Sequence, residues 1–173
     1  VVYLAHDPTL DREVAVKRIQ SRYADDPSSR RRFVTEAEIT ARLDHPGVVP
    51  VFGLVKDGFN RPCYAMRFIE GESLREAIER FHKGDRSGWD PGERGLAFRG
   101  LLSRFVAVCN TMAYAHSRGV VHRDLKPGNI MVGRFGETLV VDWGLARAAD
   151  EGPTAGSGEA AEREECQTDT RTG

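Results

Sequence analysis

The sequence has little of what marks secreted, zinc-binding or membrane-spanning chains. Its three cysteines, Cys63, Cys109 and Cys166, are scattered among 173 residues and include no Cys-x-x-Cys pair. Such a set predicts neither a disulfide framework nor a zinc site, and it favours a reducing, cytoplasmic compartment. No apolar run approaches the roughly 18 residues that a transmembrane helix requires.

The chain also lacks an excess of charge of either sign. It has 25 Lys and Arg against 26 Asp and Glu, a net charge of −1, so binding to nucleic acid or to a membrane surface is not expected. It begins at Val1 without an initiator methionine, which led us to expect an excerpt that starts inside a strand.

Hydrophobic periodicity predicts strands and one helix first, then helices and a small hairpin. Alternating runs predict strands over Val1–Ala5, Glu13–Ile19, Val48–Val55, Cys63–Ile69, Ile130–Val132 and Thr138–Val141. Helical spacing predicts helices over Arg30–Leu43, Ser73–Phe81 and Leu101–Ser117. This order indicates a two-part α+β fold.

Two further expectations concern the middle of the chain. His82–Gly100 is rich in Gly, Arg and Asp and resembles a surface insertion that could include a partial helix. The helix that follows it has a broad apolar face, formed by Leu102, Phe105, Val106, Cys109, Met112, Ala113 and His116.

The most informative string is His122–Asn129, which reads HRDLKPGN. Phosphoryl transfer to an alcohol needs a carboxylate that orients the hydroxyl and accepts its proton, and oxygen ligands for Mg²⁺. Asp124 can be that carboxylate, Lys126 can place a positive charge on the transferred group, and Asn129 can hold the metal. Eight ordered positions of this kind rarely match by chance.

Asp142-Trp143-Gly144 follows a predicted strand, thirteen residues after Asn129. A hairpin opened by Asn129 and closed by Asp142 would bring both oxygen ligands to one mouth. Mg²⁺ often takes one or two carboxylates together with phosphate oxygens, so this spacing predicts a nucleotide-bound metal. Alone, the triplet is more often a turn.

A third element is Val14-Ala15-Val16-Lys17, in which Ala15 and Lys17 share one face of a strand. A small apolar residue beside an ammonium suits an adenine edge next to a phosphate. Glu36, in the first predicted helix, can pair with Lys17. Both residues also have a purely structural interpretation. Lys17 could be an exposed lysine on an amphipathic strand, and Glu36 could pair with Arg32 on the helix surface.

Together these residues resemble the eukaryotic-like serine/threonine protein kinase family, and its bacterial members in particular. Lys126, two residues after Asp124, is the cue for the serine/threonine branch. The resemblance covers Val1 to Arg147. It implies a β-rich lobe over 1–69, the first part of a helical lobe over 70–147, an acidic activation-loop segment over 148–173, ATP and Mg²⁺ as cofactors, and a protein substrate.

The resemblance also implies roles for single positions. Lys17 would contact the α- and β-phosphates and Glu36 would fix it, with Glu38 as the weaker candidate. Asp124 would be the catalytic base. Apolar positions would hold the adenine and form the hinge: Val2, Ala15, Met66, Phe68 and Met131. Regulation would pair Arg123 with a phosphorylated threonine, for which the candidates are Thr168, Thr170 and Thr172.

The sequence departs from the family pattern in two ways. Trp143 stands where most members have phenylalanine, and its indole N–H would need a partner if buried. No Gly-x-Gly-x-x-Gly string occurs, so the excerpt alone is expected to be inactive.

Two other functions share parts of this pattern. A small-molecule phosphotransferase of the aminoglycoside or choline kinase type shares much of the pattern, but Lys126, Gly144 and the threonine-rich end favour a protein substrate. A pseudokinase would usually lack one of three residues that are all present, namely Lys17, Asp124 and Asp142.

Overall fold

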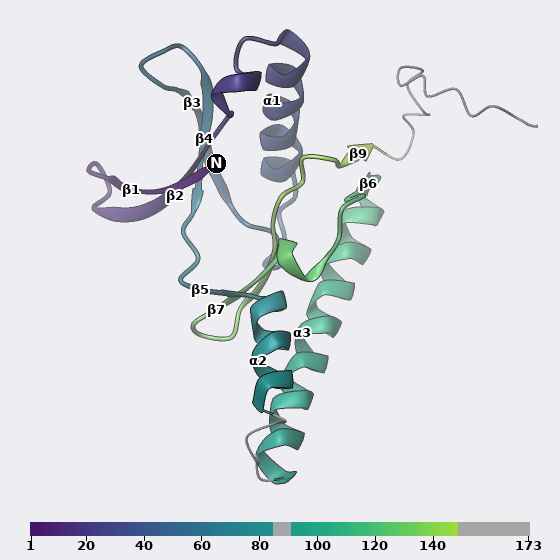
Figure 1. Ribbon diagram of the computed structural model, residues 1–173. Helices are drawn as coiled ribbons and strands as arrows, with labels where there is room; N and C mark the ends of the chain where they lie inside the picture. The colour runs from purple at the N-terminus through teal and green to yellow at the C-terminus, as the bar shows by residue number, and fades with distance from the viewer. Residues whose placement is uncertain (85–90, 149–173) are drawn as a thin grey trace, which may run out of the picture.

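The first part of the chain folds into an antiparallel sheet covered by one helix. The computed structural model describes residues 1–84 and 91–148 (Figure 1). Four strands make the sheet in the order β1-β2-β4-β3: β1 (Val2–Asp7), β2 (Arg12–Arg18), β3 (Val51–Lys56) and β4 (Pro62–Arg67). A short 3₁₀ turn, η1 (Ser21–Tyr23), leads to helix α1 (Pro27–Arg42), which packs against β3 and β4.

Local chemistry fixes where α1 begins. The carboxylate of Asp26 accepts hydrogen bonds from the backbone N–H groups of Ser28 and Ser29, and Pro27 occupies the first turn, where its missing N–H costs nothing. The predicted helix is confirmed, with a start three residues earlier than expected. Phe33, Glu36 and Thr40 lie on its buried side, so a charged residue is held on the face that meets the sheet.

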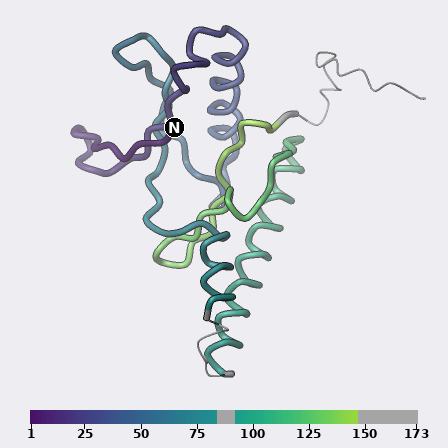
Figure 2. The backbone as a smooth tube through the Cα atoms, viewed as in Figure 1, coloured from purple at the N-terminus to yellow at the C-terminus, as the bar shows by residue number. Residues whose placement is uncertain are grey.

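The second part contains a small sheet and two long helices. The sheet has the order β5-β7-β8, with β5 (Gly71–Ser73), β7 (Ile130–Gly133) and β8 (Thr138–Val140). The other elements are α2 (Leu74–Gly84), α3 (Pro91–Ser117), β6 (Val120–Val121), η2 (Pro127–Asn129) and β9 (Arg147–Ala148). Figures 1 and 2 show α2 and α3 side by side at the end of the molecule away from β1 and β2.

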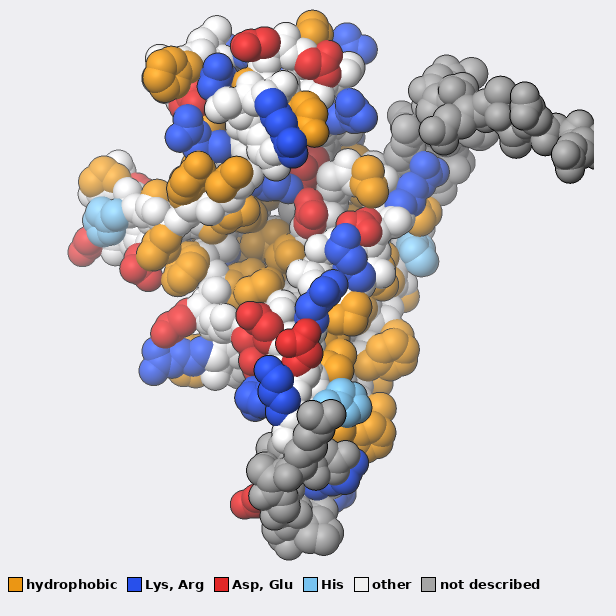
Figure 3. Space-filling view, viewed as in Figure 1, with side chains coloured by type: hydrophobic (Ala, Val, Ile, Leu, Met, Phe, Trp, Pro, Cys, Tyr) orange, Lys and Arg blue, Asp and Glu red, His pale blue; other side chains and the backbone are white. Residues whose placement is uncertain are grey.

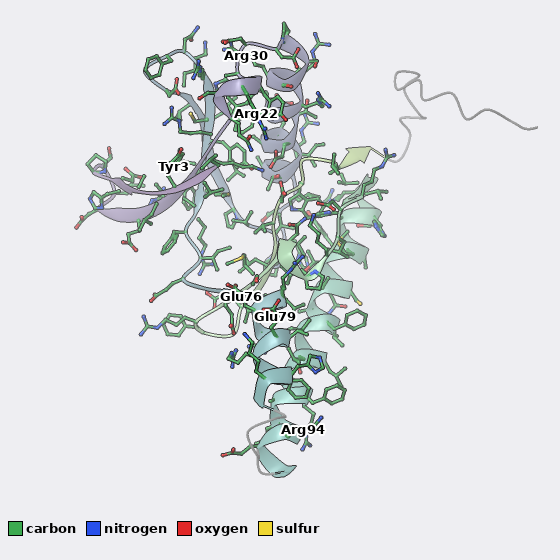
Figure 4. The ribbon with its side chains drawn as sticks, in the orientation of Figure 1. Tyr3, Arg22, Arg30, Glu76, Glu79 and Arg94 are labelled. Carbon is green, nitrogen blue, oxygen red and sulfur yellow. The ribbon has the colours of Figure 1, made fainter. Side chains whose placement is uncertain are left out.

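Helix α2 begins as its sequence predicts. The backbone N–H of Glu76 donates to the Ser73 hydroxyl, and the backbone N–H of Ser73 donates to the Glu76 carboxylate at 2.7 Å. This reciprocal pair satisfies two N–H groups that a helix start leaves open. Glu76 and Glu79 mark this first part of the helix in Figure 4.

Within His82–Gly100, the described residues are helical and mostly exposed. Helix α2 continues to Gly84, and α3 begins at Pro91, so residues 91–100 form its first turns. The glycines lower helix propensity in this stretch, but propensity is a weak guide where tertiary packing is available. The rings of Phe81 and Phe98 pack 6.2 Å apart between the two helices.

Helix α3 turns one stripe of side chains into the core and leaves most of the apolar face named from the sequence exposed. Val108, Met112 and Ala115 enter the main core with side chains from α2, β7 and β8. From the predicted face only Met112 is buried, whereas Phe105 is 62% exposed. The helix has apolar residues on several sides, so periodicity alone could not identify the core side. The exposed members of the predicted face are Leu102, Phe105, Val106, Cys109, Ala113 and His116.

Hydrophobic side chains are visible along the outer side of α3 in Figure 3. Even so, none of the helices within residues 1–84 and 91–148 is long and apolar enough to span a bilayer.

Candidate active site

A cavity of about 400 Å³ lies between the four-stranded sheet and the β7–β8 hairpin. The corresponding hollow, with hydrophobic walls, can be seen below the sheet in Figure 3. Every residue predicted to bind the nucleotide or its metal lines this cavity: Val2, Ala15, Lys17, Met66, Phe68, Asn129, Met131 and Asp142. These residues come from five separate segments of the chain, and the fold brings them to one cavity.

Two larger hollows border α1, one of about 660 Å³ beside Trp143–Ala146 and one of about 800 Å³ beside β3. Neither contains Lys17, Asn129 or Asp142, so we place the site in the smaller cavity. Its lining also includes residues that sequence reasoning missed: Thr40, Val49, Tyr64, Arg67, Ile69 and Val141.

Lys17 joins the sheet, the helix and the segment after β8. Its ammonium forms an ion pair with Glu36 Oε1 and another with Asp142 Oδ1 at 2.9 Å. Burial alone would lower the pKa of Lys17, but the carboxylates of Glu36 and Asp142 outweigh it and raise the pKa. The predicted Lys17–Glu36 pair is confirmed, and Glu38 lies exposed on the outer side of α1.

The loop before β7 forms a second charged cluster. Asp124 Oδ2 accepts hydrogen bonds from Lys126 Nζ at 2.6 Å and from Asn129 Nδ2 at 3.0 Å. The Lys126 bond lowers the pKa of Asp124, against the opposite effect of burial, and the Asn129 bond adds to the lowering. Asp124 is therefore a carboxylate at neutral pH, which is the form that can accept a proton.

Asn129 and Asp142 lie at the two ends of the β7–β8 hairpin, as predicted. Ile130 pairs with Val140, and the N–H of Val141 donates to the Asn129 carbonyl at 2.9 Å, which closes the mouth. The Asn129 amide nitrogen also bonds the Asp124 carbonyl, so its amide oxygen stays available for a cation.

In the described part of the chain, no three His, Cys, Asp or Glu side chains cluster as a metal site would require. Asn129 and Asp142 instead suit a cation that is bound by an amide oxygen, a carboxylate and phosphate oxygens, as Mg²⁺ is.

His122 links the segment that carries Asp124 to the segment that carries Asp142. Its Nδ1 accepts the backbone N–H of Asp124 at 3.3 Å, so Nε2 carries the proton and donates to the Val141 carbonyl at 3.2 Å. Burial lowers the pKa of His122, which keeps the ring neutral at pH 7. The ring packs on Trp143, whose indole N–H finds its expected partner in the Val140 carbonyl.

Two non-glycine residues of the site have left-handed backbone conformations. Arg123 has φ 66° and Asp142 has φ 64°. Such angles are uncommon for arginine and concentrate at sites where the surroundings enforce them. Arg123 is exposed and pairs with no acid of residues 1–84 and 91–148, while its predicted partners Thr168, Thr170 and Thr172 lie outside the described residues.

The buried neutral His122 predicts a pH dependence of stability. Its pKa is lowered on folding, so below about pH 6.5 the unfolded chain takes up a proton that the folded chain does not. As the pH is lowered below that value, the free energy of unfolding should decrease, by at most about 1.4 kcal/mol per pH unit from this group.

Urea unfolding from about pH 5 to 7.5 measures this effect. The free energy of unfolding should depend less on pH in His122→Gln than in the wild type, and its pH dependence should be unchanged in the exposed control His116→Gln. Equal slopes in all three proteins would contradict this.

Comparison with known proteins agrees with this geometry. Residues 1–168 match the family described as protein kinase domain. The chain is 39% identical over 152 residues to the serine/threonine-protein kinase PknD of Protochlamydia amoebophila, covering 88% of this chain and 15% of that protein. It is 43% identical over 145 residues to PknD of Chlamydia muridarum, covering 84% and 15% respectively.

The chain therefore spans about a seventh of the length of these relatives, 15% in each case. The family match, the bacterial relatives and the two-part fold around the cavity all agree. The chain belongs to the protein kinase domain family and resembles its bacterial serine/threonine members.

Proposed function

We propose that the protein transfers the γ-phosphate of ATP to serine or threonine hydroxyls of protein substrates. The observation that carries this proposal is the meeting of Lys17, Asn129 and Asp142 in one cavity with an apolar inner wall. We further propose that residues 1–69 and 70–147 act as the two lobes on either side of it.

The apolar wall suits the base of the nucleotide. Ala15 and Met66 are cross-strand partners on β2 and β4, and Met131 faces the cavity from β7. The adenine would lie between Val2 and Ala15 on one side and Met131 on the other, with Phe68 at the hinge. Lys17 would then reach the α- and β-phosphates.

The polar end suits metal-bound phosphates. Asn129 through its amide oxygen and Asp142 through its carboxylate would hold Mg²⁺, which when bound neutralises charge on the phosphate oxygens. Asp142 is 49% exposed on its side chain, so it remains accessible even while it pairs with Lys17.

Asp124 would perform the proton step. Its carboxylate orients the substrate hydroxyl and takes its proton as the hydroxyl oxygen bonds the γ-phosphorus. The bond between the γ-phosphorus and the bridging oxygen breaks, and ADP leaves with that oxygen. Lys126, 2.6 Å from Asp124, lies where its ammonium can stabilise charge on the transferred group.

We also propose that Arg123 binds a phosphate on Thr168, Thr170 or Thr172. Arg123 is exposed beside Asp124 and has its charge free of any acid in the described ranges, so a phosphothreonine could pair with it bidentately. Arginine–phosphate pairs of this kind order loops in regulated enzymes.

One experiment tests both the phosphoryl-transfer proposal and the proposal for Arg123. The full-length protein that carries these residues is incubated with Mg²⁺, γ-labelled ATP and a basic protein, or with an aminoglycoside or choline. We expect label on serine and threonine of the protein substrate, and mass spectrometry should find phosphate on at least one of the three threonines. Labelling of the small molecules alone would favour the alternative phosphotransferase. An active enzyme without modified threonines would exclude the regulatory proposal only.

A further inference from the structure

Glu36 has a second partner that the sequence did not indicate. The hydroxyl of Tyr64 donates a hydrogen bond of 2.7 Å to Glu36 Oε1, the same oxygen that pairs with Lys17. Tyr64 is 3% exposed and Glu36 is 6% exposed, so water does not compete for this bond. A buried carboxylate is costly unless donors surround it, and here two donors converge on one oxygen.

The position of Tyr64 follows from the sheet. It lies on β4 directly opposite Lys17 on β2, so both side chains leave the same face and meet α1. The Tyr64 ring also packs against Phe33 of α1, with centroids 5.3 Å apart. Ring and hydroxyl thus contact the same helix, one turn apart.

The other oxygen of Glu36 faces Gly144. A Cβ on that glycine would lie 3.1 Å from Glu36 Oε2, closer than nearly all side-chain contacts. The carboxylate is therefore confined by Lys17, by Tyr64 and by the backbone that follows Trp143.

The two donors differ in what they can do. Lys17 also pairs with Asp142, and with nucleotide bound its ammonium would interact with the phosphates as well as with Glu36. Among residues 1–84 and 91–148, the Tyr64 hydroxyl bonds to Glu36 alone. Burial and the neighbouring carboxylate of Glu36 raise the pKa of Tyr64 far above its ordinary value, so the hydroxyl remains a donor at every working pH.

We propose that Tyr64 is a positioning residue, whose hydroxyl holds Glu36 and helix α1 in place while Lys17 engages the phosphates. This rests on the proposed nucleotide site, and Tyr64 acts through Glu36 without touching the reacting atoms. The phenol would supply the hydrogen bond that keeps the carboxylate satisfied when Lys17 is shared.

The test is Tyr64→Phe in the full-length protein, which keeps the ring and removes the bond. We expect kcat/KM for ATP to fall roughly 10- to 100-fold, the range for a hydrogen bond to a charged group. Tyr114→Phe is the matched control. The Tyr114 ring stacks on His45 at 5.0 Å, and no hydrogen bond to its hydroxyl occurs within the described ranges, so activity should be unchanged.

A double substitution separates positioning from packing. In Glu36→Ala the tyrosine hydroxyl has no carboxylate to hold, so adding Tyr64→Phe should change kcat/KM by less than about twofold. Equal losses from Tyr64→Phe in both backgrounds would overturn the proposal, as would full activity of the single variant.

Amide hydrogen exchange gives a readout that does not need activity. We expect faster exchange in α1 around Glu36 in Tyr64→Phe and not in Tyr114→Phe, measured with a non-hydrolysable ATP analogue and Mg²⁺. If the wild-type protein transfers no phosphate, the proposed function fails, whereas unchanged exchange in Tyr64→Phe contradicts the role of Tyr64 alone.

Discussion

Asparagine in place of Asp124 is expected to lower kcat by about 10²–10⁴-fold, the usual contribution of an oriented acid–base group. The substitution keeps the size of the side chain and removes the carboxylate that two donors hold, Lys126 at 2.6 Å and Asn129 at 3.0 Å. An amide cannot take the hydroxyl proton at neutral pH, so the chemical step should suffer.

Nucleotide binding should be almost unaffected, because Asp124 is not among the residues that line the cavity. Initial rates with a basic protein substrate give kcat, and a fluorescent ATP analogue gives the dissociation constant. Asp25→Asn, an exposed acid before α1, serves as the matched control. If Asp124→Asn retained wild-type kcat, Asp124 could not be the base.

Alanine in place of Asp142 is expected to lower kcat/KM for ATP by about 10³-fold or more, because metal stabilisation of phosphate charge is worth several kcal/mol. The side chain is one of two proposed metal ligands and also pairs with Lys17 at 2.9 Å. Its removal would therefore weaken the metal site and free Lys17 to pair with Glu36 alone.

The dependence on Mg²⁺ distinguishes this effect from simple loss of structure. The half-saturating Mg²⁺ concentration should rise in Asp142→Ala and remain unchanged in Asp25→Ala. Circular dichroism should show equal folding, since the Asp142 side chain is 49% exposed. Unchanged Mg²⁺ dependence with low activity would remove Asp142 from the metal site.

Much of the site could be predicted because its chemistry lies in short ordered strings. Asp124, Lys126 and Asn129 lie within six residues, and their mutual hydrogen bonds need only one turn, η2. The hairpin between Asn129 and Asp142 is equally local, so its closed mouth followed from turn geometry.

Other features depend on contacts that a sequence does not display. Strands β5, β6 and β9 have only two or three residues, too few for a period of two to be seen. The partnership of Tyr64 with Glu36 depends on the register between β2 and β4, and β3 carries a shift near Val51 and Gly53 in the same sheet. A slip of one residue would turn Tyr64 to the other face.

The buried side of α3 was missed for a related reason. Val108 and Met112 point to the core and Phe105 and Val106 do not, although all four are apolar. The choice is made by packing against α2 and the β7–β8 hairpin, which the periodicity of α3 itself does not show.

The central claim is that one cavity binds ATP with Mg²⁺ between the sheet and the β7–β8 hairpin. A crystal structure of the full-length protein with Mg²⁺ and a non-hydrolysable ATP analogue tests it most directly. The account predicts adenine between Ala15 and Met131, phosphates at Lys17, and a metal held by Asn129 and Asp142. A nucleotide bound elsewhere, or phosphates that reach none of these three polar residues, would contradict it.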